Sequence, residues 1–173
     1  TYSITEERAY EVRKQLEVAI TGKYTGVRDS YASIINALEQ SGAKLGAHVN
    51  LRWIETTSIT NAEEAGRALE GVHGILVPGG FGARGTEGKI QCIHYARTHN
   101  VPFLGLCLGF QLAAVEFARS VCGLADAAST EFLQDAEHPV IDLLPEQKKL
   151  EGLGGNMRLG GRWVEVKPGT VAH

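Results

Sequence analysis

Short apolar runs alternate along this 173-residue chain with longer segments in which apolar side chains recur every three or four positions. The short runs predict buried strands, and the longer segments predict helices. The predicted strands are 16–21, 49–54, 74–77 and 101–106, and the predicted helices are 30–40, 60–69, 86–98 and 108–121. Because each strand is followed by a helix through a short connection, the pattern predicts an α/β fold with a doubly wound, mostly parallel sheet.

Local signals refine some of these boundaries. Thr60 and Glu63 have the spacing of a capping box at a helix start. Ser41 and Gly42 are expected to end the helix before them. Beyond Gly123 the helical periodicity stops, and short apolar runs at 140–143 and 162–166 predict a small antiparallel extension beside the main sheet.

The fourth predicted strand ends in a turn that carries a cysteine. Gly105 and Gly109 flank Cys107 with the spacing of a nucleophile elbow. The N-terminus of the following helix stabilises a thiolate, and its free N–H groups, beginning at Leu108, can bind an oxyanion. A buried structural cysteine is the alternative, but the strand–turn–helix context favours a nucleophile.

The glycine-rich loop after the third strand has two interpretations. Gly80 to Gly85 fits the dinucleotide pattern G-x-G-x-x-G. That fingerprint belongs on the first strand of its unit, however, and the next strand here ends without the acidic residue that holds a ribose. The chemical interpretation is that Gly79 or Gly80 supplies the second N–H of an oxyanion hole, beside that of Leu108.

A cysteine that attacks a carbonyl group needs a base, usually a histidine oriented by a carboxylate. None of the six histidines stands in an H-x-E or H-x-D pattern. His138 precedes Pro139, but no carboxylate follows two residues later, and His173 is the last residue. The sequence therefore predicts a nucleophile and its oxyanion donors, but it shows no base.

The overall composition excludes several classes of function. A net charge of -3 gives no electrostatic basis for binding nucleic acid or an anionic membrane, and no apolar run is long enough to cross a bilayer. An odd number of cysteines without C-x-x-C spacing argues against a disulfide framework or a zinc site and fits a cytoplasmic protein: Cys92, Cys107 and Cys122. Since the chain lacks an initial Met and stops abruptly, we expect a piece of a longer protein.

The segment 105–111 resembles the nucleophile motif G-x-C-x-G-x-Q of class I glutamine amidotransferases. Four further segments resemble the glutaminase domains of the CTP synthase family, in the same order along the chain: 22–24, 77–89, 129–132 and 154–160. The resemblance implies a flavodoxin-like sheet. It also implies that residues 1–15 are a linker from an N-terminal synthase domain and that 16–173 are a glutaminase domain without its C-terminal part.

The same resemblance implies a reaction. Cys107 would attack the side-chain amide of L-glutamine, release ammonia and form a glutamyl thioester, which water hydrolyses. The ammonia would pass to the synthase domain, a ligase that uses ATP and magnesium to aminate UTP to CTP in pyrimidine biosynthesis, with GTP as the allosteric activator. No cofactor or metal is expected in the glutaminase domain, and the full-length enzyme is expected to be a homotetramer.

Site residues follow from matched positions. Gly80 and Leu108 would form the oxyanion hole, with Gly79 as the adjacent candidate. Residues matching the glutamine site are Gly80, Phe81, Leu108, Gly109, Phe110, Gln111 and Glu131, and those matching the GTP-responsive lid are Arg84, Glu87 and Arg158. Gln111 and Glu131 would hold the amino-acid end of glutamine. The family's catalytic His and Glu would lie beyond the last residue, so we expect little or no turnover from this chain alone.

Two other functions remain open from the sequence. A different cysteine amidase or hydrolase on the same fold would use the same elbow, but it gives no reason for the motifs around Glu131 and Arg158. A non-catalytic, amidotransferase-like regulatory module is compatible with the absence of a base, but such a module does not need a strained nucleophile turn.

Overall fold

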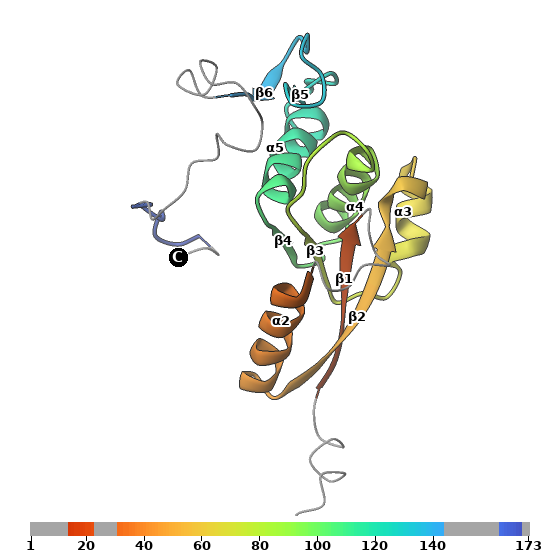
Figure 1. The fold of residues 1–173 in the computed structure, drawn as a ribbon, viewed down its shortest axis with the longest axis vertical. Helices are drawn as coiled ribbons and strands as arrows, with labels where there is room; N and C mark the ends of the chain where they lie inside the picture. Colours follow the sequence, from red (N-terminus) through yellow and green to blue (C-terminus); the bar gives the residue numbers. More distant parts are fainter. Residues whose placement is uncertain (1–13, 23–30, 144–162, 171–173) are drawn as a thin grey trace, which may run out of the picture. The chain divides into compact units, whose positions relative to one another are not determined.

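The computed structural model describes residues 14–22, 31–143 and 163–170. The contacts divide the chain into two units, Thr1–Asp142 and Leu143–His173. The described elements all lie in the first unit (Figure 1): β1 (Lys14–Gly22), α2 (Ala32–Lys44), β2 (Ala47–Glu55), η2 (Thr56–Ser58), α3 (Ala62–Leu69), β3 (Gly74–Val77), α4 (Thr86–Thr98), β4 (Phe103–Gly105), α5 (Leu108–Ser120), β5 (Ala128–Ser129) and β6 (Pro139–Ile141). Among the described residues, no helix has the length and apolar character needed to span a membrane.

The main sheet has four parallel strands in the order β2-β1-β3-β4, which confirms the parallel α/β prediction. At the carboxyl ends of the two strands that precede the candidate site, Val77 of β3 pairs with Gly105 of β4. The loop after β3 and the turn after β4 therefore leave the sheet side by side. In open parallel sheets, ligand sites form at this edge.

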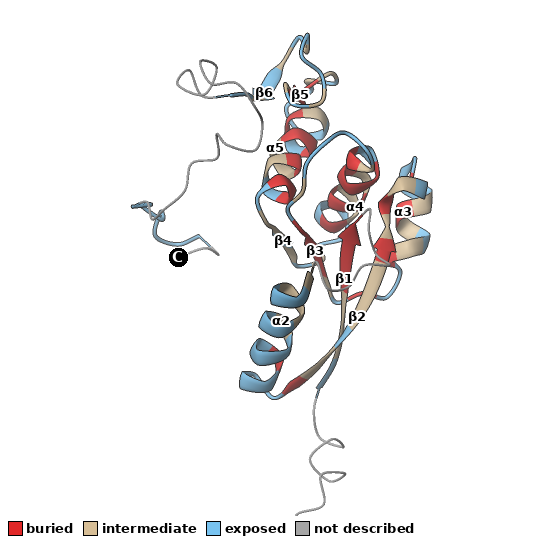
Figure 2. Cartoon of the chain, in the orientation of Figure 1, coloured by how far each residue is buried: buried red, intermediate tan, exposed pale blue. Residues whose placement is uncertain are grey.

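Both faces of the sheet are covered by helices, because side chains alternate along each strand. Ile54 of β2 joins the core formed with α3, α4 and α5. Trp53 faces the other way, and its ring lies 5.3 Å from that of Tyr31, just before α2. Figure 2 shows the buried residues gathered in β1, β3, α4 and α5, whereas α2 is mostly exposed.

The first helix does not end where the sequence predicts. Helix α2 continues through Gly42 to Lys44, and the chain turns at Leu45 and Gly46. Gly42 is buried against β2, where an added Cβ would lie 2.9 Å from both the carbonyl oxygen of Ala47 and Cγ2 of Val49. This glycine therefore permits close packing of a helix on a strand instead of terminating the helix.

The cap of α3 is displaced by one residue from the predicted capping box. The N-cap is Asn61, whose side-chain oxygen accepts a hydrogen bond from Glu64 N at 2.9 Å. The Glu64 carboxylate in turn accepts from the N–H of Thr60 at 2.7 Å. The capping bond therefore joins Asn61 and Glu64 rather than Thr60 and Glu63, and the return bond of Glu64 goes to the residue before the N-cap, Thr60.

The predicted antiparallel extension is wrong for the described residues. Strands β5 and β6 pair in parallel, with Ala128 opposite Pro139. The chain between them reverses twice, since turns form at 129–133 and at 133–136, and the second strand consequently returns in the same direction. Residues 163–166, part of the other predicted strand, are exposed and form no strand.

Candidate active site

Cys107 occupies a strained turn between β4 and α5. It is the N-cap of α5 and has φ 52° and ψ -109°, a conformation that non-glycine residues rarely adopt. The turn is secured by hydrogen bonds on both sides, from Leu106 N to Val77 O at 2.9 Å and from Gln111 N to Cys107 O at 3.1 Å. Such strain, of about 1–3 kcal/mol, persists where the surrounding structure enforces it and is typical of functional sites.

Two glycines make this turn sterically feasible. A Cβ on Gly109 would lie 2.0 Å from the carbonyl oxygen of Val77, and a Cβ on Gly105 would lie 2.7 Å from the carbonyl carbon of Gly109. The first turn of α5 therefore rests directly on the backbone of β3 and β4. The sharp strand–helix turn predicted from the G-x-C-x-G spacing is present for this reason.

The glycine-rich loop after β3 approaches the cysteine from the neighbouring strand. A Cβ built on Gly79 would lie 3.4 Å from Cβ of Cys107 and 3.9 Å from its Sγ. A Cβ built on Gly80 would lie 3.6 Å from Cδ2 of Leu108, so Gly80 lies against this side chain. Within the described residues, the N–H groups of Gly79, Gly80 and Leu108 donate to no backbone acceptor, so they are available to a substrate oxygen.

The three cysteines differ in accessibility. Cys107 and Cys122 are exposed, whereas Cys92 is buried in α4. Burial raises the pKa of the Cys92 thiol to about 12, so this thiol stays protonated near neutral pH. Cys122 lies beyond the end of α5. Cys107 is therefore the exposed thiol at the N-terminus of a helix.

The residues matched to glutamine binding come from three regions, of which the glycine-rich loop, with Gly80 and Phe81, is described above. Phe110 and Gln111 lie in the first turn of α5, and Gln111 is half-buried. Glu131 lies far away in the sequence, just after β5, but its Oε1 accepts a hydrogen bond from Gly82 N at 2.8 Å. The structure therefore brings the Glu131 carboxylate to the loop whose other end lies at Cys107.

The residues matched to the GTP-responsive lid are only partly described. Arg84 is exposed at the end of the glycine-rich loop, and Arg158 lies outside the described residues. Glu87, in the first turn of α4, forms an ion pair of 2.9 Å with Arg119 of α5. Because Arg119 also donates from Nε to the carbonyl oxygen of Ala127 at 2.6 Å, Glu87 is linked to the segment that leads to β5.

One polar neighbour of the loop was not foreseen from the sequence. Lys89 is only 4% exposed, although it lies in the first turn of α4 directly after the loop. Its Nζ lies 3.9 Å from the point where a Cβ of Gly80 would stand. Lysine is rarely buried to this extent, and the sequence pattern gives no signal for it beyond its closeness to the glycines.

No histidine is hydrogen-bonded to Cys107 in the parts of the chain that the structure describes. His94 instead contacts the buried Glu116, with Nδ1 2.9 Å from Oε1. Arg97 holds the same carboxylate through Nη2 at 2.8 Å. These three side chains join α4 to α5, so His94 has a packing role.

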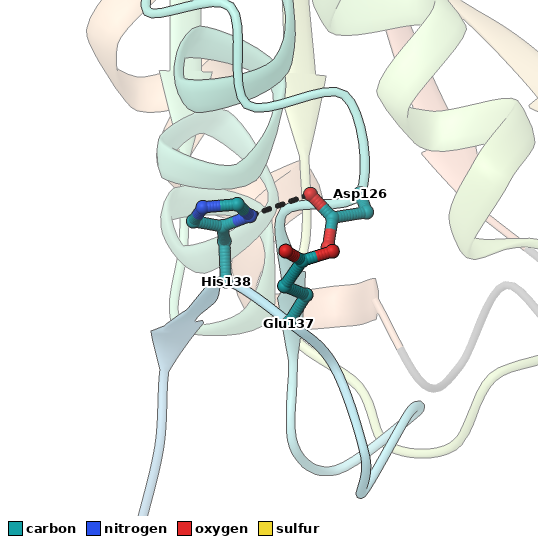
Figure 3. A group of neighbouring side chains, drawn as sticks. All are labelled: Asp126, Glu137 and His138. Atoms are coloured by element: carbon teal, nitrogen blue, oxygen red, sulfur yellow. Dashed lines mark hydrogen bonds and ion pairs between the residues drawn. The ribbon is translucent and has the colours of Figure 1, made fainter.

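His138 does have a carboxylate partner, although none follows it in the sequence. Its Nδ1 lies 2.6 Å from Oδ1 of Asp126, and Glu137 lies beside them (Figure 3). The hydrogen bond from His138 holds the pKa of Asp126 below its usual value. Ligand atoms of these three residues lie within 4.8 Å of one another, a spacing that could hold a metal ion.

This His138 cluster is unsuited to act as the base for Cys107. Asp126 is next to Ala127, whose carbonyl oxygen is bound by Arg119 in the last turn of α5. Cys107 caps the opposite end of the same 13-residue helix. At 1.5 Å per residue these ends are about 18 Å apart, too far for a direct proton transfer.

Comparisons with known proteins agree with this geometry. The family model "Glutamine amidotransferase class-I" matches residues 26–170. CTP synthases of Archaeoglobus fulgidus and Halalkalibacterium halodurans are 52% and 48% identical over 167 residues, which are 96% of this chain and 31% of each relative. A solved glutaminase domain of Trypanosoma brucei CTPS with bound acivicin has a TM-score of 0.71 and 36% identity, covering 76% of this chain and 51% of that one.

The extent of these matches differs between the chain and its relatives. The chain spans about a third of the length of the curated relatives that it matches, 31% in the two CTP synthases above. The family model, in contrast, covers most of the chain, including the glycine-rich loop and the cysteine elbow. The chain therefore belongs to the class I glutamine amidotransferase family.

Proposed function

We propose that this chain is the glutaminase domain of a CTP synthase and that Cys107 is its nucleophile. The observation that carries the proposal is the approach of Gly79 to Cys107, with 3.4 Å between its added Cβ and that of the cysteine. Gly79 and Gly80 in the loop after β3 and Leu108 at the start of α5 thus lie around an exposed thiol, and their N–H groups make no backbone hydrogen bond within the described residues. Two such donors and a nucleophile are two of the parts that acyl transfer requires, the third being a base.

In this mechanism the sulfur of Cys107 bonds to the side-chain amide carbon of L-glutamine. The carbonyl oxygen becomes an oxyanion, which the N–H groups of Gly80 and Leu108 stabilise, with Gly79 as the adjacent donor. The leaving nitrogen takes the proton that the thiol loses, so collapse breaks the C–N bond, releases ammonia and leaves a glutamyl thioester. Water then cleaves the C–S bond, yielding glutamate and the free cysteine.

Side chains around Cys107 orient the substrate. Glu131 and Gln111 bind the amino-acid end of glutamine, since a carboxylate is the natural partner of an ammonium. Phe81 and Phe110 flank the pocket with apolar surface. Gly109 lies in the same turn of α5 and is assigned to the glutamine site from its matched position.

The role of this domain within a longer enzyme is proposed from its sequence identity to CTP synthases. Ammonia passes to a synthase domain that aminates UTP with ATP and magnesium, GTP activates the reaction, and Arg84, Glu87 and Arg158 transmit that activation. The assembly is a cytoplasmic homotetramer. A non-catalytic module is the alternative to be tested.

Covalent labelling by 6-diazo-5-oxo-norleucine, a glutamine analogue, tests the proposal without requiring turnover. We expect a single adduct by intact mass, located at Cys107 by peptide mapping and suppressed by excess L-glutamine. D-glutamine is the matched control, because it has the same groups in the opposite configuration and should protect Cys107 poorly from labelling. Cys122 is an internal control, since it is also exposed.

Three outcomes separate the alternatives. Labelling confined to Cys107 and blocked by L-glutamine supports a glutaminase site. Labelling of Cys107 that L-glutamine does not block favours another cysteine hydrolase. Equal labelling of Cys107 and Cys122, or no adduct, contradicts an assembled nucleophile site and favours a non-catalytic module.

A further inference from the structure

The loop between β3 and α4 is anchored at its ends but exposed between them. Pro78 and Thr86 are buried, whereas Phe81 to Arg84 are exposed. At the α4 end, the hydroxyl of Thr86 donates to the carbonyl oxygen of Ala83 at 2.7 Å. The middle of the loop needs support from elsewhere if its first glycines are to stay aligned with Cys107.

Glu131 provides such support from a distant part of the chain. Its Oε1 accepts the Gly82 N–H at 2.8 Å, across 49 residues of sequence. A hydrogen bond from a backbone N–H to a carboxylate is charge-assisted and stronger than a neutral one. Gly82 lies three residues beyond Gly79, so a restraint at Gly82 limits the movement of the donors beside Cys107.

Glu131 is itself held by a turn rooted in the core. The buried Ser129 accepts a hydrogen bond from Glu131 N at its Oγ, and its carbonyl oxygen accepts from Phe132 N and Leu133 N. Phe132 packs against the hydrophobic core. The carboxylate therefore projects from a fixed base, which lets it position a loop.

One carboxylate oxygen remains available after this bond is made. Oε1 binds Gly82, whereas Oε2 makes no hydrogen bond to any residue that the structure describes. An ionised carboxylate has about four acceptor positions on its two oxygens. An ammonium group at Oε2 would therefore add to the Gly82 bond without displacing it.

We infer that Glu131 is a positioning residue that clamps the Gly82 turn beside Cys107, and that the same carboxylate is completed by the ammonium of an α-amino-acid substrate. The substrate part rests on the proposed function. Because the ammonium binds the carboxylate in its loop-holding position, substrate and loop closure stabilise each other. The oxyanion donors are then most ordered when glutamine is bound.

Limited trypsin digestion at Arg84 measures the clamp without depending on activity. Arg84 is exposed within the clamped loop, and the fragment that ends at this residue is identified by its mass. Cleavage of a locally opened segment follows the population of the open form. Removing a charge-assisted bond with Glu131→Ala should accelerate cleavage at Arg84 about fivefold or more in the ligand-free chain.

The conservative variant separates the two roles of the carboxylate. Glu131→Gln keeps an oxygen for the Gly82 N–H and should be cleaved within about twofold of the wild-type rate. L-glutamine should slow cleavage of the wild type but protect the Gln variant only at higher concentrations, because an amide binds an ammonium weakly. Asp135→Ala, at an exposed acid in the same connection, is the matched control and should behave as wild type.

Three results would overturn the inference. Equal ligand-free cleavage of Glu131→Ala and wild type refutes the clamp, as does a Gln variant that is cleaved as fast as the Ala variant. If L-glutamine blocks labelling of Cys107 but does not protect Arg84, the shared carboxylate is refuted while the glutaminase proposal stands. If L-glutamine blocks neither, the glutaminase proposal fails, and the ligand-free comparison still decides the clamp.

Discussion

The contact between Gly109 and Val77 permits a quantitative test of the elbow. In Gly109→Ala the new Cβ would lie 2.0 Å from the carbonyl oxygen of Val77 and 2.8 Å from its carbonyl carbon. These are backbone atoms of a buried strand and cannot rotate away. Since normal contacts exceed about 3 Å, helix α5 and strand β3 must separate by about 1 Å.

That separation should weaken both the fold and the site. Overpacking of a core typically costs about 1–3 kcal/mol, and a clash with backbone belongs at or above the upper limit. Because Cys107 starts the same helix, it also moves away from Gly79. Labelling by the glutamine analogue should then slow at least tenfold, which corresponds to a rise of about 1.4 kcal/mol in the activation free energy. Urea unfolding and the labelling rate measure the two effects separately.

Gly66→Ala is the matched control, because Gly66 is also helical but its added Cβ has only Tyr95 Cε2 nearby, at 3.9 Å. There, the gain in helix propensity should stabilise the protein by up to about 1 kcal/mol. If Gly109→Ala unfolds at the wild-type urea concentration and reacts at the wild-type rate, the steric argument for the elbow is refuted.

Two further predictions concern buried ionisable groups in α4 and α5. Burial raises the pKa of Glu116, but hydrogen bonds from Arg97, His94 and Ser120 outweigh burial and leave the pKa below its usual value. The ionised Glu116 therefore stabilises the fold above its pKa in the unfolded chain, and this contribution is lost as the pH falls through its pKa in the folded chain. Glu116→Gln should therefore lower the free energy of unfolding by about 1–2 kcal/mol at pH 7. Urea unfolding should also show that the variant loses less stability than the wild type below about pH 4. If the two proteins lose the same stability in acid, the prediction is contradicted. For Cys92, with a pKa of about 12, a thiol reagent at pH 8 should modify only Cys107 and Cys122 until urea is added, whereas rapid reaction of all three in the native chain would show that α4 opens.

Local patterns in the sequence were sufficient to predict the order of strands and helices and the position of the elbow. Short apolar runs and helical spacing report burial within one element, and all four main strands and the helices after them overlap the predicted ranges. The elbow is equally local, since Gly105 and Gly109 are needed within one turn of Cys107. Where a local signal was ambiguous, as at Gly42 and Thr60, packing and side-chain geometry chose a different boundary.

Contacts between distant segments were decided only by the tertiary structure. The parallel pairing of β5 and β6, the burial of Lys89 beside Gly80, and the bond from Gly82 to Glu131 leave no periodic trace in the sequence. Each depends on how loops from different strands meet at the carboxyl edge of the sheet, and local propensity does not encode that meeting. The sequence by itself therefore determined the turn that carries Cys107, whereas the folded chain decided which distant groups lie beside it.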